Sequence, residues 1–170
     1  PQVTLDSTEY FEDGVADSFT GAETGAWTVA GGRYTGTPIG SVGAVDLLDL
    51  GVGFLSTSYV EPEATLSTTG IGGIAFDAYA ANDYKFVALD VPNQRVLVGH
   101  VDPRHAWVVD SGFSQVLNAG TDYVLNLAQQ GTVVTVSLNG NVVGSVAFNA
   151  GVSDGKVGVV AKSGTTSFDR

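Results

Sequence analysis

TVVTVSLNGNVVGSVAF, residues 132–148, consists of two segments in which apolar residues alternate with small or polar ones, joined by Asn139 and Gly140. Alternation with a period of two is typical of a β-strand that buries one face. Asn-Gly supplies the two positive φ angles that a type I′ turn requires between antiparallel strands. The stretch therefore predicts a hairpin with strands at 132–138 and 142–148.

The same strand pattern continues outward along the chain in both directions. No window of 11 or more residues keeps the apolar i, i+3, i+4, i+7 spacing of a helix. Short apolar or alternating runs are separated by turn residues, such as Ala-Asn-Asp at 81–83 and Ser-Asp-Gly at 153–155. The further predicted strands are 26–29, 33–37, 45–50, 54–60, 73–79, 84–90, 95–101, 106–110, 123–129, 156–161 and 165–168.

About a dozen short strands without crossover helices exclude a parallel α/β fold and leave a sandwich, jelly roll or barrel. Runs such as YKFVALD at 84–90 are apolar on both faces, which favours a sheet covered on each side. A chain of 170 residues can bury a core without disulfides. We therefore predict an all-β, antiparallel jelly-roll sandwich with little or no helix, as a single domain over residues 1–170.

Composition narrows the setting of this domain. Eighteen acidic and seven basic residues give a net charge of −11, which disfavours nucleic acid and anionic lipid as partners. No apolar run is long enough for membrane insertion, and the absence of cysteine excludes disulfides and thiolate metal sites. Pro1 and the absence of methionine suggest a piece of a longer, processed chain. We expect one module of a secreted or cell-surface bacterial protein, with an acidic cytosolic domain as the alternative.

Three stretches of the chain resemble laminin-G-like and concanavalin A-like jelly rolls. These are FEDGVADSFTGAETGAWTVAGGRYTG at 11–36, GGIAFDAYAANDYKFVALD at 72–90 and GKVGVVAKSGTTSFDR at 155–170. The resemblance implies that the acidic aromatic motif lies on a first strand, with the Phe168-Asp169 pair beside it. It also implies packing roles for Trp27 and Tyr34. The family contains carbohydrate-binding modules, adhesin domains and some enzymes that act on glycans, so the fold alone does not choose among these functions.

Acidic side chains near both chain ends form a candidate calcium site. The resemblance implies that the two ends are neighbours, which would bring Glu12 and Asp13 near Asp169. Calcium accepts six to eight oxygen ligands in irregular geometry, so a few carboxylates and backbone carbonyls suffice. Solvated loop acids without a metal are the alternative, since no regularly spaced calcium-binding loop is present.

RVLVGHVDPRHAWVV, residues 95–109, contains both histidines and one of the two tryptophans. If a regular hairpin turns at Pro103-Arg104, His100 faces Trp107 across the two strands. An aromatic ring can stack on a sugar ring while neighbouring polar side chains bind the sugar hydroxyls. The alternative is that Trp107 packs at the edge of the core. In the strand at 73–79, Ile74 and Phe76 are the predicted core side. The predicted carbohydrate-binding residues are Trp107, His100, Arg95, Arg104, Tyr79 and Asp77.

Catalysis is the competing hypothesis. Glycosidases need two suitably spaced carboxylates, and Glu61 and Glu63 share one strand face, although Pro62 between them indicates an edge or a bulge. A lyase site would need His100, Tyr84 and Arg95 together, yet Arg95 and His100 lie on opposite faces. We therefore predict a non-catalytic, extracellular glycan-binding or adhesion module that partners other domains of its chain. A glycan-active enzyme and a structural spacer of an adhesin remain the alternatives.

Overall fold

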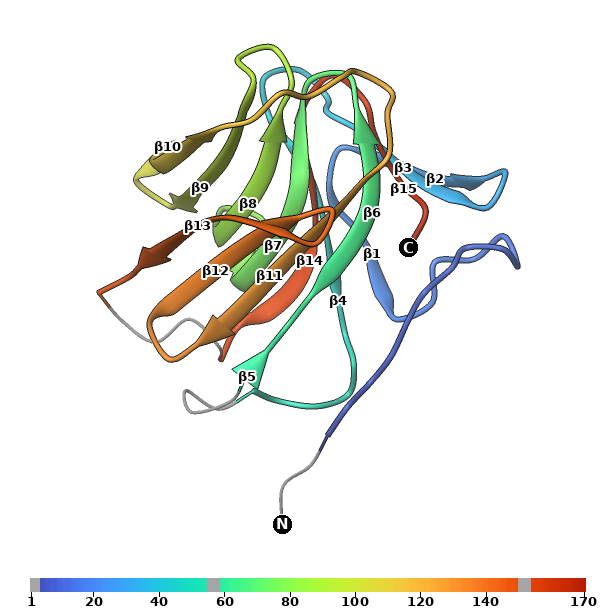
Figure 1. Ribbon diagram of the computed structural model, residues 1–170. Coiled ribbons are helices and arrows are strands. Elements are labelled where there is room, and N and C mark those ends of the chain that lie inside the picture. Colours follow the sequence, from blue (N-terminus) through green and yellow to red (C-terminus); the bar gives the residue numbers. More distant parts are fainter. Residues whose placement is uncertain (1–3, 55–58, 150–153) are drawn as a thin grey trace.

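Two antiparallel β-sheets packed face to face form the protein (Figure 1). The structure is a computed structural model and describes residues 4–54, 59–149 and 154–170. No helix occurs in these ranges, so none of them provides a helical membrane span. In the described chain, one sheet has the order β1 (Phe19–Thr24), β4 (Ala44–Leu48), β14 (Lys156–Ser163), β7 (Ile71–Ala80), β8 (Asp83–Asp90), β9 (Arg95–Asp102), β10 (His105–Ser114).

The second sheet pairs strands from the beginning, middle and end of the chain. Its order is β13 (Asn141–Ala147), β12 (Val133–Leu138), β11 (Tyr123–Gln130), β6 (Glu63–Thr68), β15 (Thr166–Phe168), β3 (Arg33–Thr37), β2 (Ala26–Ala30), and the short β5 (Tyr59–Val60) also pairs with β11. The predicted all-β antiparallel sandwich is therefore confirmed. The hairpin of β12 and β13 is confirmed as well, with positive φ angles of 50° at Asn139 and 81° at Gly140.

Two strands were missed by the sequence patterns, and one was predicted too long. β6 was missed because its buried side chains, Ala64, Leu66 and Thr68, include one small and one polar residue. Its inward and outward faces therefore differ little in hydrophobicity. β1 is mostly exposed and has almost no apolar pattern. Of the predicted strand at 54–60, only β5 is a strand among the described residues, and positions 55–58 lie outside them.

The first-strand expectation from the resemblance is wrong. The acidic aromatic motif around Phe11 forms no strand, and β15 lies between β3 and β6. Phe11 reaches the core through its ring instead, stacking on Tyr34 with 5.3 Å between ring centroids. Trp27 also stacks on Tyr34, with 5.0 Å between ring centroids, so the predicted packing roles of Trp27 and Tyr34 are confirmed.

The main core fills the space between the two sheets. Ile74 and Phe76 are buried there, as predicted, together with the inward residues of β11 and β12. Apolar burial of this kind is the main favourable term in folding. The largest of its fully buried members are Phe76, Phe168, Leu66, Leu89, Leu125 and Leu127.

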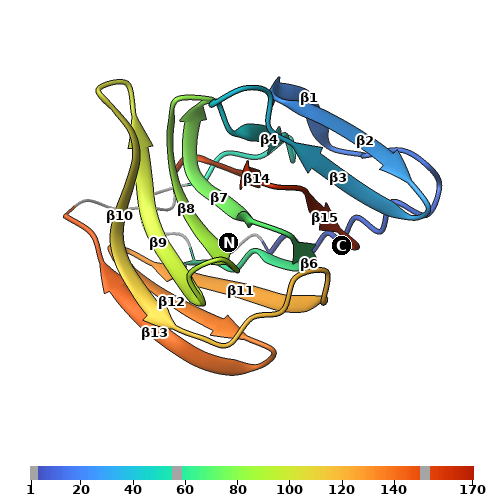
Figure 2. The ribbon, with the colours of Figure 1, turned by 90° about the horizontal axis from the view of Figure 1, so that it is seen from above.

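The seven-stranded sheet has a second apolar face, which points away from the other sheet. Tyr84, Phe86 and Leu97, at alternate positions of β8 and β9, belong to a separate buried cluster on this side. β14 and β10 are four strand spacings apart, about 19 Å in a flat sheet. The Lys162 ammonium of β14 nevertheless lies 5.7 Å from the Trp107 ring of β10. The sheet is therefore strongly curved, and this face is its concave side (Figure 2).

Candidate functional site

The hairpin of β9 and β10 turns at Pro103-Arg104, as predicted, but its strands do not pair regularly. Asp102 pairs with His105, after which a register shift places Val108, not Trp107, opposite His100. Pro103 has φ near −65° and cannot enter a type I′ turn. A non-primed turn splays the strands, and a β-bulge after it restores their twist.

The predicted pairing of His100 with Trp107 is therefore wrong. His100 shares the face of Val96 and Val98, which belongs to the core between the sheets. Trp107 packs on the concave side against the Phe86 cluster. The bulge thus sends the indole to the face opposite the imidazole.

Trp107 rests on an aromatic support. Its ring lies parallel to that of Phe86, with 3.6 Å between ring centroids and 9° between the planes. Gly99, in the strand between them, leaves room for this stack, because a Cβ there would come within 2.5 Å of Phe86 Cζ. One face of the indole is therefore held by Phe86, and the side chain is only partly buried.

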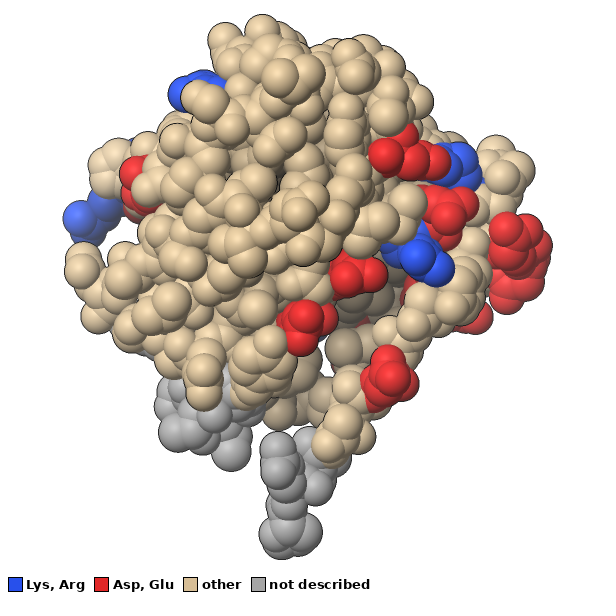
Figure 3. Space-filling view, viewed as in Figure 1, with Lys and Arg blue, Asp and Glu red and all other residues tan. Residues whose placement is uncertain are grey.

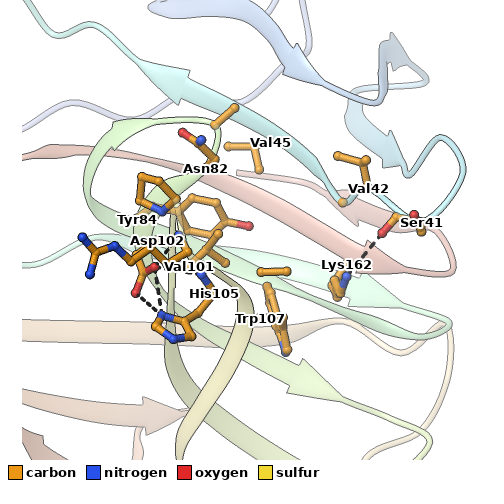
Figure 4. Close-up of a pocket in the computed structure, with 15 residues that line it drawn as sticks. Ser41, Val42, Val45, Asn82, Tyr84, Val101, Asp102, His105, Trp107 and Lys162 are labelled. Atoms are coloured by element: carbon orange, nitrogen blue, oxygen red, sulfur yellow. Dashed lines mark hydrogen bonds and ion pairs between the residues drawn. The ribbon is translucent and has the colours of Figure 1, made fainter.

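Trp107 forms part of the lining of a pocket of about 400 Å³ at one end of the concave face (Figure 4). The turn between β9 and β10 forms one wall, and the turn between β7 and β8 lies beside it. Val45 and Val101 contribute apolar surface. The polar residues of the lining are Ser41, Asn82, Tyr84, Asp102, Arg104, His105 and Lys162.

The polar groups of the pocket differ in how many of their hydrogen bonds are made within the protein. Asp102 accepts hydrogen bonds from the His105 ring and from the backbone N–H groups of Arg104 and His105. The His105 ring and these backbone groups hold the pKa of Asp102 below its usual value. Tyr84 is 4% exposed, and burial raises its pKa. Its hydroxyl points into the pocket (Figure 4) without a hydrogen-bond partner among the described residues.

Of the predicted binding residues, the structure brings only Trp107 and Arg104 into this pocket. His100 lies on the opposite face, where its Nδ1 is 2.7 Å from Asp110 Oδ2. Arg95 lies at the other end of β9 and forms an ion pair at 3.1 Å with Asp90, which is fully buried. The prediction that Arg95 and His100 occupy opposite faces agrees with this arrangement.

Asp77 and Tyr79 form a cluster of their own on β7. Asp77 is 4% exposed and has a positive φ of 45°, which aspartate tolerates better than most residues. It is ion-paired with Lys85, and the Tyr79 hydroxyl donates to it at 2.9 Å. The same hydroxyl lies 2.6 Å from Asp154 Oδ1, so the two carboxylates share its single hydrogen, and this contact holds the pKa of Asp154 below its usual value. These contacts fix the bulged end of β7 and face away from the pocket.

Sequence reasoning missed Tyr84 and Lys162 as pocket residues. Tyr84 was considered only for a lyase site, although it shares the alternating face of Phe86. Lys162 could not be found from the sequence, because it comes from β14 and reaches Trp107 only through the curvature of the sheet.

The predicted calcium ligands do not converge. Asp169 faces Arg33 at 3.7 Å, Asp13 accepts from the Val15 N–H, and Glu12 lies against Gly32. Acidic side chains do gather on this side of the molecule, with a few basic ones among them (Figure 3). Nevertheless, no three His, Asp or Glu side chains in the described ranges are arranged to hold a metal ion.

Calcium bound by Asp169 would compete with Arg33 for this carboxylate. From the described geometry we expect the same melting temperature in millimolar calcium and in excess chelator, because a ligand stabilises only a protein that binds it in the folded state. Thermal denaturation in both solutions checks this. A higher melting temperature in calcium that Asp169→Asn abolishes would contradict it and establish the site.

Glu61 and Glu63, the predicted alternative catalytic pair, meet on the outer side of the eight-stranded sheet. The Asn126 side-chain amide donates to both carboxylates, at 3.0 Å and 3.2 Å, and the Tyr59 hydroxyl donates to Glu61 at 2.8 Å. These side chains are exposed and lie outside the concave-face pocket.

The chain has the fold of concanavalin A-like and galectin-like β-sandwiches, as its similarity to solved structures shows. No protein-family model and no curated protein sequence matches it. Among solved structures it is similar to the carbohydrate-binding module CBM66 from Bacillus subtilis, with a TM-score of 0.74 and 17% identity, covering 89% of this chain and 91% of that one.

Two further solved structures mark the breadth of this fold. The Caenorhabditis elegans galectin LEC-6 has a TM-score of 0.52 and 11% identity, covering 78% of this chain and 91% of that one. The alginate lyase AlgAT5 of polysaccharide lyase family 7 has a TM-score of 0.52 and 14% identity, covering 84% of this chain and 78% of that one. At these identities the similarity establishes the fold alone.

Proposed function

We propose that this protein is a non-catalytic glycan-binding module and that the concave-face pocket is its binding site. The observation that carries the proposal is the placement of Trp107, a supported and partly exposed indole, in a pocket ringed by hydroxyl, amide and charged groups. Sugars present an apolar C–H face to aromatic rings and hydroxyl groups to polar neighbours.

The geometry of the pocket suits a sugar ring. Phe86 occupies one face of the indole, and the Lys162 ammonium lies over the ring at 5.7 Å from its centroid. A sugar therefore has the part of the other face that Lys162 does not cover. The Tyr84 hydroxyl, which has no hydrogen-bond partner among the described residues, and the Asn82 amide are available to bind sugar hydroxyls. Asp102 is held in place by its own turn, and a rigid polar group binds at a lower entropic cost.

The proposed setting is a secreted or cell-surface bacterial protein in which the domain binds an extracellular polysaccharide beside other domains of the same chain. Structural similarity to a carbohydrate-binding module and to a galectin supports this proposal. The composition supports it too, because the chain carries few charged residues and most of them are acidic. An adhesion role is the form that glycan binding takes if the parent protein is an adhesin.

We expect Trp107→Ala to weaken binding roughly 30-fold, about 2 kcal/mol, because central aromatic residues carry much of the energy of a binding site. The measurement is a glycan array followed by calorimetric titration of the best ligand. Tyr59→Ala is the matched control, since Tyr59 is an exposed aromatic on the other sheet.

Trp107 also packs on Phe86, so the variant must first be shown to be folded by its circular dichroism and melting temperature. Trp107→Phe keeps an aromatic ring on Phe86 and should retain part of the affinity. Binding that is unchanged in a folded Trp107→Ala protein would remove the pocket from the proposal. Release of products from a polysaccharide, lost in Glu61→Gln or Glu63→Gln, would replace the proposal with an enzyme at the outer sheet.

A further inference from the structure

We infer that the pocket selects acidic glycans, in which a sugar carboxylate pairs with Lys162 and Arg104. This inference rests on the proposed glycan-binding function and names its ligand class. The chain as a whole is strongly acidic, with 18 acidic and only seven basic residues. Two of those seven nevertheless line one pocket.

The cations of the pocket differ from three of the five other basic residues of the chain. Arg33, Lys85 and Arg95 each form an ion pair with an aspartate. Among the described residues, Arg104 and Lys162 form no ion pair. Two cations without a counter-ion beside one cavity favour an anionic ligand, because an opposite charge lowers the free energy of both.

The one carboxylate in the pocket does not cancel these charges. Asp102 directs its oxygens to the N–H groups of Arg104 and His105 and to the His105 Nδ1, and its Oδ2 also lies 3.8 Å from His100 Nε2. Within the described ranges, the Lys162 ammonium contacts the Ser41 carbonyl at 3.5 Å and the Trp107 ring at 5.7 Å. It is therefore available for a carboxylate on a sugar that stacks beside that ring.

A second hollow continues the pocket along the sheet end. It is lined by hydroxyl-bearing and small residues and shares Ser41 and Lys162 with the first. Lys162 thus stands at the junction of the two. An oligosaccharide can lie across both, with one ring beside Trp107 and the next among the hydroxyl groups. The hydroxyl-bearing residues of the second hollow are Thr37, Ser41, Ser163 and Thr165.

A carboxylated sugar fits these features better than the other anions do. Phosphate or sulfate alone would leave the indole face without a partner, whereas a uronic acid offers both a C–H face and a carboxylate. The net charge of −11 opposes long-range attraction of any polyanion. Selectivity must then come from short-range pairing in the pocket, where salt screens charges least.

The experiment compares sugars that differ only in charge. The probes are oligogalacturonates, alginate oligomers and hyaluronan oligomers, each beside its methyl-esterified form, within an array that also holds neutral glycans. We expect binding to at least one acidic probe, with its methyl ester about tenfold weaker, since hydrogen bonds to charged groups contribute about that much. A neutral ligand bound no less tightly than every acidic probe would overturn the inference and leave the proposed function standing.

Variants then assign the selectivity to the pocket. Lys162→Gln and Arg104→Gln should each weaken binding of the acidic probe about tenfold and leave the methyl ester unaffected, whereas Lys162→Arg should restore most of the affinity. Lys156→Gln is the matched control, because Lys156 is an exposed lysine on the same strand, outside both hollows. Equal losses for acid and ester in Lys162→Gln would also overturn the inference. No binding to any glycan would instead remove the proposed function itself.

Discussion

Replacing Gly99 by alanine is expected to lower the free energy of unfolding by about 4 kcal/mol, because overpacking that forces backbone shifts is among the most damaging core changes. A Cβ at this position would lie 2.5 Å from Phe86 Cζ and would also collide with the Val108 carbonyl oxygen of β10. The ring could turn only by leaving Trp107. The carbonyl could retreat only by breaking the pairing of β9 with β10.

Urea denaturation of the purified variant measures this effect, with Gly112→Ala as the matched control. Gly112 lies in β10, and a Cβ there would have no neighbour closer than 3.6 Å, which is an ordinary contact. We expect Gly112→Ala to change stability by less than about 1 kcal/mol. Similar stabilities for Gly99→Ala and Gly112→Ala would show that the Phe86 and Trp107 stack is not held as tightly as described.

The fold could be predicted because its signals are local. Asn139-Gly140 fixes one hairpin through φ angles alone, and alternation places Ile74 and Phe76 in the core without knowledge of their partners. β6 was missed because its inward side chains include Ala64 and Thr68, whose burial depends on neighbours from β11 and β15. A strand of that kind is recognised by its position in the sheet more than by its composition.

The site was only partly predictable because it depends on departures from regular pairing. Trp107 and Arg104 were identified by type, but one bulge after Pro103 reversed the face of the indole relative to His100. Lys162 joins them from a strand about 55 residues away in sequence, through sheet curvature that no local pattern encodes. Arg95 and Asp77 looked functional because they are polar residues in apolar strands, yet each is half of a structural ion pair.

Tyr34 and Asp46 form the most deeply buried polar pair in the aromatic layer near Trp27. Asp46 is fully buried, and burial raises the pKa of its carboxyl, while the hydrogen bond from the Tyr34 hydroxyl opposes that rise. Its other oxygen, Oδ1, has no partner in the described structure. The hydroxyl is therefore the main side-chain group that keeps a negative charge tolerable at this depth.

Tyr34→Phe is expected to lower the free energy of unfolding by about 3 kcal/mol near pH 8, because it leaves a buried carboxylate without its donor. The ring remains, so the stacking on Phe11 and Trp27 is kept. A carboxyl whose folded pKa is raised favours folding below its unfolded pKa of about 4 and loses that contribution as the pH rises through the folded pKa. Removing the hydroxyl raises the folded pKa of Asp46 further. The free energy of unfolding of the variant therefore falls more than that of the wild type as the pH rises.

The difference in free energy of unfolding between wild type and Tyr34→Phe should therefore be smallest near pH 3, at about 1 kcal/mol for a neutral hydrogen bond. It should increase as the pH rises. Urea denaturation across this range measures the difference.

Tyr123→Phe is the control. The wild-type Tyr123 hydroxyl accepts from the Asn118 N–H at 2.8 Å and contacts no carboxylate of the described residues, so the loss of stability in Tyr123→Phe should stay constant with pH. In Tyr34→Phe/Asp46→Asn no buried charge remains, and the pH dependence should disappear. A gap that stays constant with pH would mean that Asp46 is protonated in the wild type throughout, in which case Tyr34 serves only packing and a neutral hydrogen bond.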